Sequence, residues 1–143
     1  MAHVQSNARQ TSPYEWFESE IAGCIPSGAV VLGLQTYWLG LRQYSYRSWL
    51  LPIYFAQPRT YHEPMDLDAA LARVNPDVIL VDRYIDELMT KAASPADPNH
   101  ALYVGFERFK AHRRPTLACV VKDRTYGTMQ VYLVPSQVSA RDR

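Results

Sequence analysis

Two short runs of apolar residues, 29–34 and 78–81, contain no polar side chain and are bounded by turn-forming residues. Such runs are typical of strands buried on both faces. Each run follows a segment whose apolar residues recur at spacings of three and four, which predicts an amphipathic helix before each strand. These helices begin near Tyr14 and near Asp66. Two strands joined by a crossover that contains a helix are expected to be parallel.

The second half of the chain continues this alternation. Apolar spacing predicts one helix after Asp82 and another that ends before Pro115, with a loop rich in turn residues over 93–100 between them. Two β-rich segments then flank a short turn, which predicts a hairpin over residues 116–134. We therefore predict a Rossmann-like α/β fold, in which a mostly parallel sheet of about four strands is flanked by helices and ends in an antiparallel C-terminal strand.

The length of 143 residues fits one domain. We assign residues 13–135 to a single α/β domain, residues 1–12 to a disordered N-terminal segment or linker, and residues 136–143 to a polar tail. No apolar run approaches the roughly 18 residues of a membrane-spanning helix, and the polar N-terminus lacks the apolar region of a signal peptide. We expect the chain, as given, to be soluble.

Charge changes this picture little. The formal net charge of +1 excludes a global field that would attract nucleic acid. Basic residues gather over 108–114, on and just after one predicted helix. We interpret them as a solvated helix face with cations near its C-terminal end. The alternative is a patch that binds phosphate or lipid headgroups.

The two cysteines, Cys24 and Cys119, form no C-x-x-C or zinc pattern. Each lies among apolar residues, so we interpret both as small buried hydrophobic side chains. The alternative is that they pair with each other, which requires a fold that brings them together in an oxidising compartment.

The densest cluster of aromatic residues lies in 37–61, which holds eight aromatics and three arginines. Aromatic faces with guanidinium donors suit sugar rings or stacked bases. The alternative is that these Tyr and Trp side chains pack an irregular crossover over the sheet edge. The segment follows the carboxyl end of the first strand, where open α/β sheets bind ligands. On this basis we predict ligand-binding residues at Tyr37, Trp38, Arg42, Tyr46, Arg47 and Asp82.

Other motifs give weaker signals. Asp66-Leu67-Asp68 matches the D-x-D pattern with which nucleotide-sugar glycosyltransferases hold a divalent metal, but both carboxylates also suit a helix N-terminus, and we prefer that interpretation. No G-x-G-x-x-G loop follows the first strand, and neither a zinc helix nor a nucleophile motif is present. We therefore predict no cofactor, no metal site and no catalytic residue in this chain.

Several segments share a pattern with one known class of domain. They are residues 25–33 (IPSGAVVLG), 37–41 (YWLGL), 46–48 (YRS), 68–82 (DAALARVNPDVILVD) and 126–132 (YGTMQVY). Through these segments the chain resembles, over residues 14–134, the C-terminal soluble extracytoplasmic domain of some bacterial membrane glycosyltransferases. These enzymes are of the dolichyl-phosphate-mannose-protein mannosyltransferase type, within the GT-C superfamily.

The resemblance implies a function that does not need an active site here. In that superfamily the membrane helices and their loops bind a lipid-phosphate sugar donor, and an acidic loop residue acts as the base. None of these parts lies in the 143 residues. We therefore expect a non-catalytic domain of an integral-membrane glycosyltransferase, on the extracytoplasmic side. Its expected partners are the membrane-embedded part of the parent enzyme and a glycan or lipid-phosphate sugar, but not nucleic acid.

Two other functions remain open. The first is a stand-alone cytoplasmic Rossmann-like module that binds a sugar or nucleotide at the carboxyl edge of the sheet. The second is an independent metal-dependent transferase that uses Asp66 and Asp68.

Overall fold

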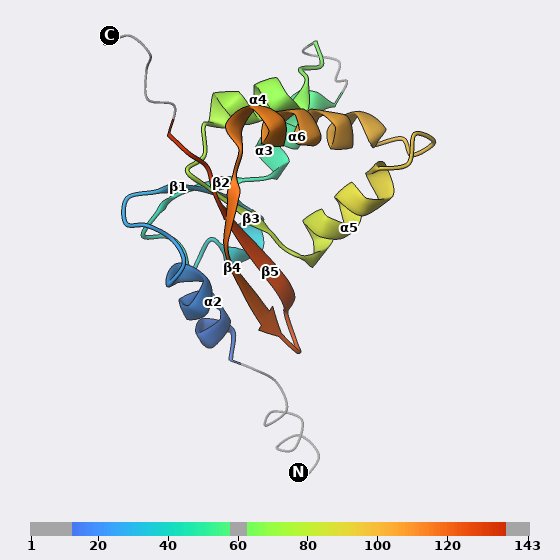
Figure 1. Cartoon of the computed structure of the whole chain (residues 1–143). Coiled ribbons are helices and arrows are strands. Elements are labelled where there is room, and N and C mark those ends of the chain that lie inside the picture. The colour runs from blue at the N-terminus through green and yellow to red at the C-terminus, as the bar shows by residue number, and fades with distance from the viewer. Residues whose placement is uncertain (1–12, 58–62, 137–143) are drawn as a thin grey trace, which may run out of the picture.

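The computed structural model describes residues 13–57 and 63–136. One open sheet holds all of its strands, in the order β2-β1-β3-β5-β4 (Figure 1). The strands are β1 (Val30–Gly33), β2 (Ser45–Ser48), β3 (Val78–Val81), β4 (Thr116–Asp123) and β5 (Gly127–Leu133). The helices are α2 (Tyr14–Ala22), the 3-10 helix η1 (Gln35–Tyr37), α3 (Leu50–Ala56), α4 (Leu67–Val74), α5 (Arg83–Ala92) and α6 (His100–Arg113).

The sheet is mixed. β1 pairs in parallel with both β2 and β3, while β5 pairs antiparallel with β3 on one side and with β4 on the other. The predicted α/β class, the parallel pair and the antiparallel C-terminal hairpin are therefore confirmed. The sheet has five strands rather than about four, and it is not mostly parallel, because two of its four strand pairings are antiparallel.

The additional strand is β2, which was predicted to be part of an irregular crossover. Its sequence, Ser-Tyr-Arg-Ser, has no apolar run, and its side chains alternate between exposed and half-buried. It is a strand because its backbone pairs with β1, from Val30 opposite Ser45 to Gly33 opposite Ser48. The short helix α3 was also missed. It tolerates Pro52 because the N–H groups of a first helical turn have no partner within the helix.

Helices cover both faces of the sheet (Figure 1). α2 and the loop after β1 pack on one face, through a core that includes Phe17, Ile21 and Leu41. α3, α4, α5 and α6 cover the other face, through a core that includes Trp49 and Phe109. Alternate residues of the buried strand β3 enter these two cores, as expected for a strand covered on both sides.

Cys24 and Cys119 form a disulfide, with their Cα atoms 6.3 Å apart. Both residues are half-buried rather than fully buried. The interpretation of two separate hydrophobic side chains is therefore wrong, and the alternative of pairing holds. The bond fastens the segment after α2 to strand β4, across 95 residues of sequence.

Two of the sequence predictions concern regions outside this description. The predicted linker, residues 1–12, lies outside the described residues. Of the predicted tail, residues 137–143 also lie outside them. Within the described part, no helix is both long enough and apolar enough to cross a membrane.

Candidate functional site

The strand order creates a topological switch between β1 and β3, because the chain leaves β1 toward β2 while β3 lies on the other side. Loops that follow the strands diverge at such a point, and open α/β sheets bind ligands there. In this protein the two loops contribute Tyr37 and Asp82. The Tyr37 hydroxyl donates to Oδ2 of Asp82 at 3.3 Å, and both side chains are buried.

The other carboxylate oxygen of Asp82 caps helix α5. Oδ1 accepts the backbone N–H groups of Tyr84 and Ile85, at 3.1 and 3.0 Å. A buried carboxylate is costly unless hydrogen bonds and a helix N-terminus compensate it, and both are present here. Burial, followed by the charge of Asp82, raises the pKa of Tyr37. The phenol therefore stays neutral at physiological pH, and both carboxylate oxygens are already engaged.

Tyr46 lies against the carboxyl end of β1, next to Tyr37 and Asp82. Its hydroxyl donates to the carbonyl of Leu34 at 2.5 Å. Its ring covers Gly33 so closely that a Cβ atom at this position would overlap the phenol oxygen. Burial is the main reason why the pKa of Tyr46 is raised. The small residue Gly33 is thus needed for close packing between β1 and β2.

Glu18 is a buried acidic residue that the sequence interpretation missed. It lies on α2, and its carboxylate accepts the backbone N–H of Gly40 at 3.1 Å. A Cβ atom at Gly40 would overlap this carboxylate. The hydroxyl of Tyr14 binds the carbonyl of Thr36 in the same loop, and burial together with a hydrogen bond to Glu18 raises the pKa of Tyr14. One signal could have found Glu18: it lies four residues after Tyr14, within the apolar stripe.

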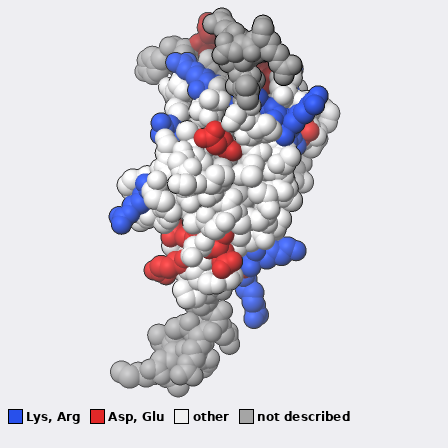
Figure 2. Space-filling model, turned by 60° about the vertical axis from the view of Figure 1, so that its left-hand side comes forward, with Lys and Arg blue, Asp and Glu red and all other residues white. Residues whose placement is uncertain are grey.

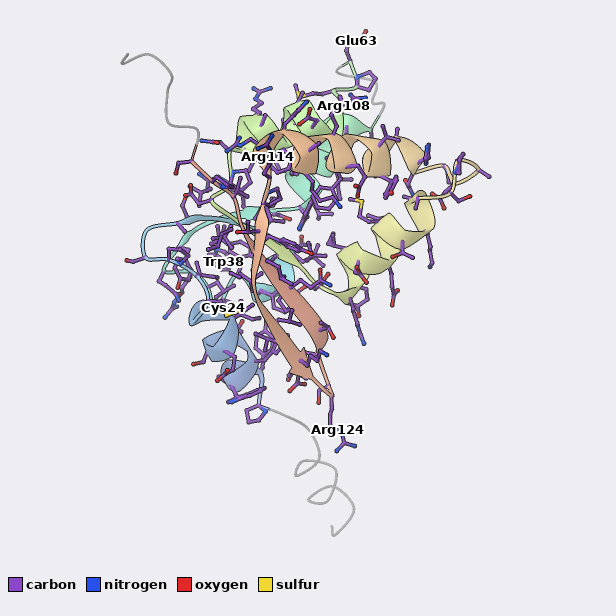
Figure 3. The ribbon with its side chains drawn as sticks, in the orientation of Figure 1. Cys24, Trp38, Glu63, Arg108, Arg114 and Arg124 are labelled. Atoms are coloured by element: carbon purple, nitrogen blue, oxygen red, sulfur yellow. A yellow bond between two sulfur atoms is a disulfide. The ribbon has the colours of Figure 1, made fainter. Side chains whose placement is uncertain are left out.

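The six predicted ligand-binding residues separate into two groups. Tyr37, Tyr46 and Asp82 form the inner group, which is partly or fully buried and engaged in hydrogen bonds within the chain. The outer group is exposed and consists of Trp38, Arg42 and Arg47. Figure 3 shows Trp38 on the α2 side of the sheet, away from Arg108 and Arg114 beside α6. The inner group lies at the carboxyl edge of the sheet, where a ligand was predicted, and its polar atoms bind the chain itself.

Asp66 and Asp68 serve helix α4 and its contact with α6. Asp66 accepts the N–H of Asp68 at 2.8 Å, as a helix cap does, which confirms the preferred interpretation of this motif. Arg108 contacts Asp66 at 2.6 Å and His112 contacts Asp68 at 2.9 Å. Within the described residues, no group of three or more His, Cys, Asp or Glu side chains is placed to hold a metal ion.

The basic residues at the end of α6 were predicted to form a solvated helix face. This prediction is wrong for one of them. Arg113 is buried, stacks over the Phe109 ring at 5.7 Å and donates to Asn75 at 3.0 Å. Arg108 and Arg114 are exposed, as expected. Asp66 and Asp68, at the start of α4, thus contact two of the side chains of this segment. Figure 2 shows that broad uncharged surface separates the basic groups from the acidic groups on one face of the molecule.

A cavity of about 360 Å³ lies on the opposite face of the sheet from α2. α5 and α6 form a V whose apex is the loop between them, and the cavity lies between these helices and the sheet (Figure 1). Its wall is mainly apolar and aromatic, with a few polar groups. Lining residues include Ile79, Met89, Tyr103, Phe106, Gln130 and Tyr132. The sequence interpretation missed this cavity because its residues come from separate segments that share no motif.

Compared with protein-family models, with curated proteins and with solved structures, the chain gives no significant match in any of the three. The assignment of function therefore depends on the residues and geometry described above.

Proposed function

We propose that this chain is a non-catalytic domain of an integral-membrane glycosyltransferase that uses a lipid-phosphate sugar donor, and that it lies on the extracytoplasmic side. The observation that carries this proposal is the Cys24–Cys119 disulfide. Structural disulfides persist in oxidising compartments outside the cytoplasm and are rare within it. Such a location agrees with the resemblance of residues 14–134 to the soluble domains of these enzymes.

The arrangement of polar side chains supports a non-catalytic role. A general acid or base must reach a substrate atom, directly or through one water molecule. The buried groups at the carboxyl edge instead bind the chain itself: Asp82 caps α5, and Glu18 holds the loop at Gly40. Burial raises the pKa of Tyr37 and Tyr46 further from the neutral pH range. These groups stabilise the loops after β1 and β3 rather than present reactive atoms.

Fractionation of the cells that make this protein tests the proposal. An antibody raised against residues 13–136 should detect a polypeptide larger than this chain, in the membrane fraction after alkaline carbonate washing. Protease added to spheroplasts should remove the epitope, because the domain faces outward. A polypeptide no larger than this chain, found in the cytosolic fraction, would contradict the proposal.

A second candidate function is a stand-alone small-molecule binding module with a Rossmann-like fold. The order β2-β1-β3, with helices on both faces, supports that fold assignment. The observation that favours binding is the cavity between α5 and α6, because its size and apolar walls are those of small-molecule sites. This cavity differs from the site predicted at Tyr37 and Trp38.

A thermal-shift screen distinguishes this second function. A ligand that binds only the folded state raises its melting temperature by mass action. Sugars and nucleotides that bind this cavity should stabilise the wild-type chain but not Ala93→Trp, which places a large ring at the cavity wall. Trp16→Ala, on the other side of the sheet, is the matched control. Equal stabilisation of all three proteins would place the ligand elsewhere.

A further inference from the structure

Residues 21–62 contain no acidic side chain. The charged groups in this stretch that the structure describes are Arg42 and Arg47, and both are exposed. Almost a third of the chain therefore carries positive charge alone, although the protein as a whole is close to neutral.

The same stretch exposes large apolar side chains. Five of the ten large hydrophobic residues that are exposed in the described chain lie within it. We call these five side chains the aromatic–leucine patch: Trp38 (51% exposed), Leu39 (66%), Leu50 (51%), Leu51 (41%) and Tyr54 (41%). Single exposed apolar residues are common, but a group of this kind marks an interaction surface.

Hydrogen bonds join the two segments that carry the patch. The hydroxyl of Ser48 donates to the side chain of Gln35 at 3.1 Å and accepts the N–H of Leu50 at 3.2 Å. Trp38 is one turn beyond Gln35, whose carbonyl accepts the Trp38 N–H at 3.1 Å. The loop after β1 and the start of α3 are therefore neighbours at the carboxyl ends of β1 and β2.

Arginines lie in or beside the segments that carry the patch, and the acid that contacts the loop after β1 is buried. Glu18 contacts the loop at Gly40 but is only 7% exposed. Arg42 and Arg47 lie on the surface of the loop and of the edge strand β2. On the far side, Arg73 of α4 lies over the Phe55 ring of α3 at 5.3 Å. The surface thus combines exposed Trp, Tyr and Leu side chains with arginines.

We propose that the aromatic–leucine patch docks on the surface of an anionic lipid bilayer. Trp and Tyr favour the headgroup region, where an apolar ring and a polar edge can both be solvated. Leu39, Leu50 and Leu51 enter the boundary with the acyl chains, while Arg42 and Arg47 bind lipid phosphates. A lipid surface fits better than a protein partner because anionic headgroups complement Arg42 and Arg47, the charged side chains that the structure describes within residues 21–62. This inference rests on the surface itself, whichever enzyme carries the domain.

Vesicle sedimentation tests the proposal directly. The purified 143-residue chain is mixed with vesicles of phosphatidylcholine, with or without phosphatidylglycerol. We expect it to sediment with the anionic vesicles and to remain in solution with the neutral ones. Each arginine near an anionic surface strengthens binding by about fivefold, so Arg42→Gln/Arg47→Gln should weaken it by about 25-fold.

Matched variants distinguish binding through the patch from nonspecific binding to vesicles. Trp38→Ala/Leu39→Ala should abolish sedimentation. Trp16→Ala/Leu117→Ala removes two side chains of similar exposure on other elements and should leave it unchanged. Arg83→Gln/Arg124→Gln is the equivalent control for charge, since both arginines are exposed and lie outside the patch. Circular dichroism of every variant confirms that the fold is retained.

Three outcomes would overturn the proposal. The first is no sedimentation with anionic vesicles, and the second is equal sedimentation of the patch and control variants. The third is a dimer in analytical ultracentrifugation that Trp38→Ala/Leu39→Ala dissociates, because the patch would then bind a second copy. None of these outcomes bears on the cellular fractionation test above, so failure of the two proposals can be distinguished.

Discussion

The hydroxyl of Tyr37 donates a hydrogen bond of 3.3 Å to Oδ2 of Asp82, between the loop after β1 and the start of α5. This contact occupies the topological switch of the sheet, where related architectures bind ligands. Asp82 is engaged by Tyr37 through one oxygen and by the N-terminus of α5 through the other. The pair therefore links two loops of the fold, and its removal should affect stability.

The first prediction concerns this pair. Tyr37→Phe should lower the free energy of unfolding by about 1 kcal/mol, because one hydrogen bond is lost. Asp82→Ala should cost about 2–4 kcal/mol, because it also removes the cap of α5. Urea denaturation measures both changes, and the double variant gives their coupling. Tyr84→Phe, at an exposed tyrosine, is the control and should change little. Additive effects of Tyr37→Phe and Asp82→Ala would refute the contact.

The second prediction concerns the close approach of Glu18 to Gly40. Gly40→Ala should destabilise the fold by about 1–3 kcal/mol, because the added methyl group displaces a buried carboxylate. Glu18→Ala in the same chain makes room for the methyl group, so the double variant should be more stable than the sum of the two single effects predicts. Chemical denaturation of the three variants checks this. Gly23→Ala is the control, since its nearest contact would be 3.4 Å away.

The third prediction concerns alkaline pH. Burial raises the pKa of Tyr37 and Tyr46 above the value of about 10 that tyrosine has when unfolded. Their contribution to stability is therefore complete below pH ~10 and is lost as the pH rises toward the folded-state pKa. Above pH ~10 the unfolded chain binds fewer protons, so stability should fall by at most about 1.4 kcal/mol per pH unit for each tyrosine. Urea midpoints measured across this range test the slope.

The same pH experiment includes its own control. Tyr37→Phe removes one of the phenols whose pKa is raised by burial and should therefore reduce the alkaline slope. An identical slope in wild type and Tyr37→Phe would show that Tyr37 ionises equally in both states.

The fourth prediction concerns the disulfide. Cys24→Ser/Cys119→Ser should lower the free energy of unfolding by about 2–5 kcal/mol, because the bond closes a long loop in the unfolded chain. The variant should still fold, since Phe17 and Ile21 of α2 remain in the core. Denaturation with and without a reductant measures the effect. The reductant should destabilise the wild type but leave the variant unchanged, and equal stability of both proteins would contradict the prediction.

The sequence predicted those parts of the fold that are determined by local pattern. β3 was predicted because all four of its residues are apolar, and α4 because an apolar stripe runs from Leu67 to Val74 between the capping residues Asp66 and Asn75. Asn75 adopts a left-handed conformation with φ 50°, which stops a helix. β2 could not be predicted in this way. Its residues have little strand preference of their own, and the neighbouring strand β1 supplies its hydrogen bonds.

The candidate site was predicted only in part for a related reason. The position of Asp82 after a buried strand was enough to place it at the carboxyl edge. Whether Tyr37 would point outward to a ligand or inward to Asp82 depends on how the loop after β1 is held. Glu18 of α2 helps to hold this loop through its hydrogen bond with the N–H of Gly40, which is 22 residues away in sequence. The pairing of Cys24 with Cys119 depends equally on long-range packing, because 95 residues separate them.

The central claim is that this domain folds on the oxidising side of a membrane. Its most direct test is peptide mapping of the protein from its own cells, with free thiols alkylated before lysis and digestion carried out without a reductant. The account predicts one peptide pair linked through Cys24 and Cys119, with neither cysteine alkylated. Recovery of both cysteines in alkylated form would contradict it.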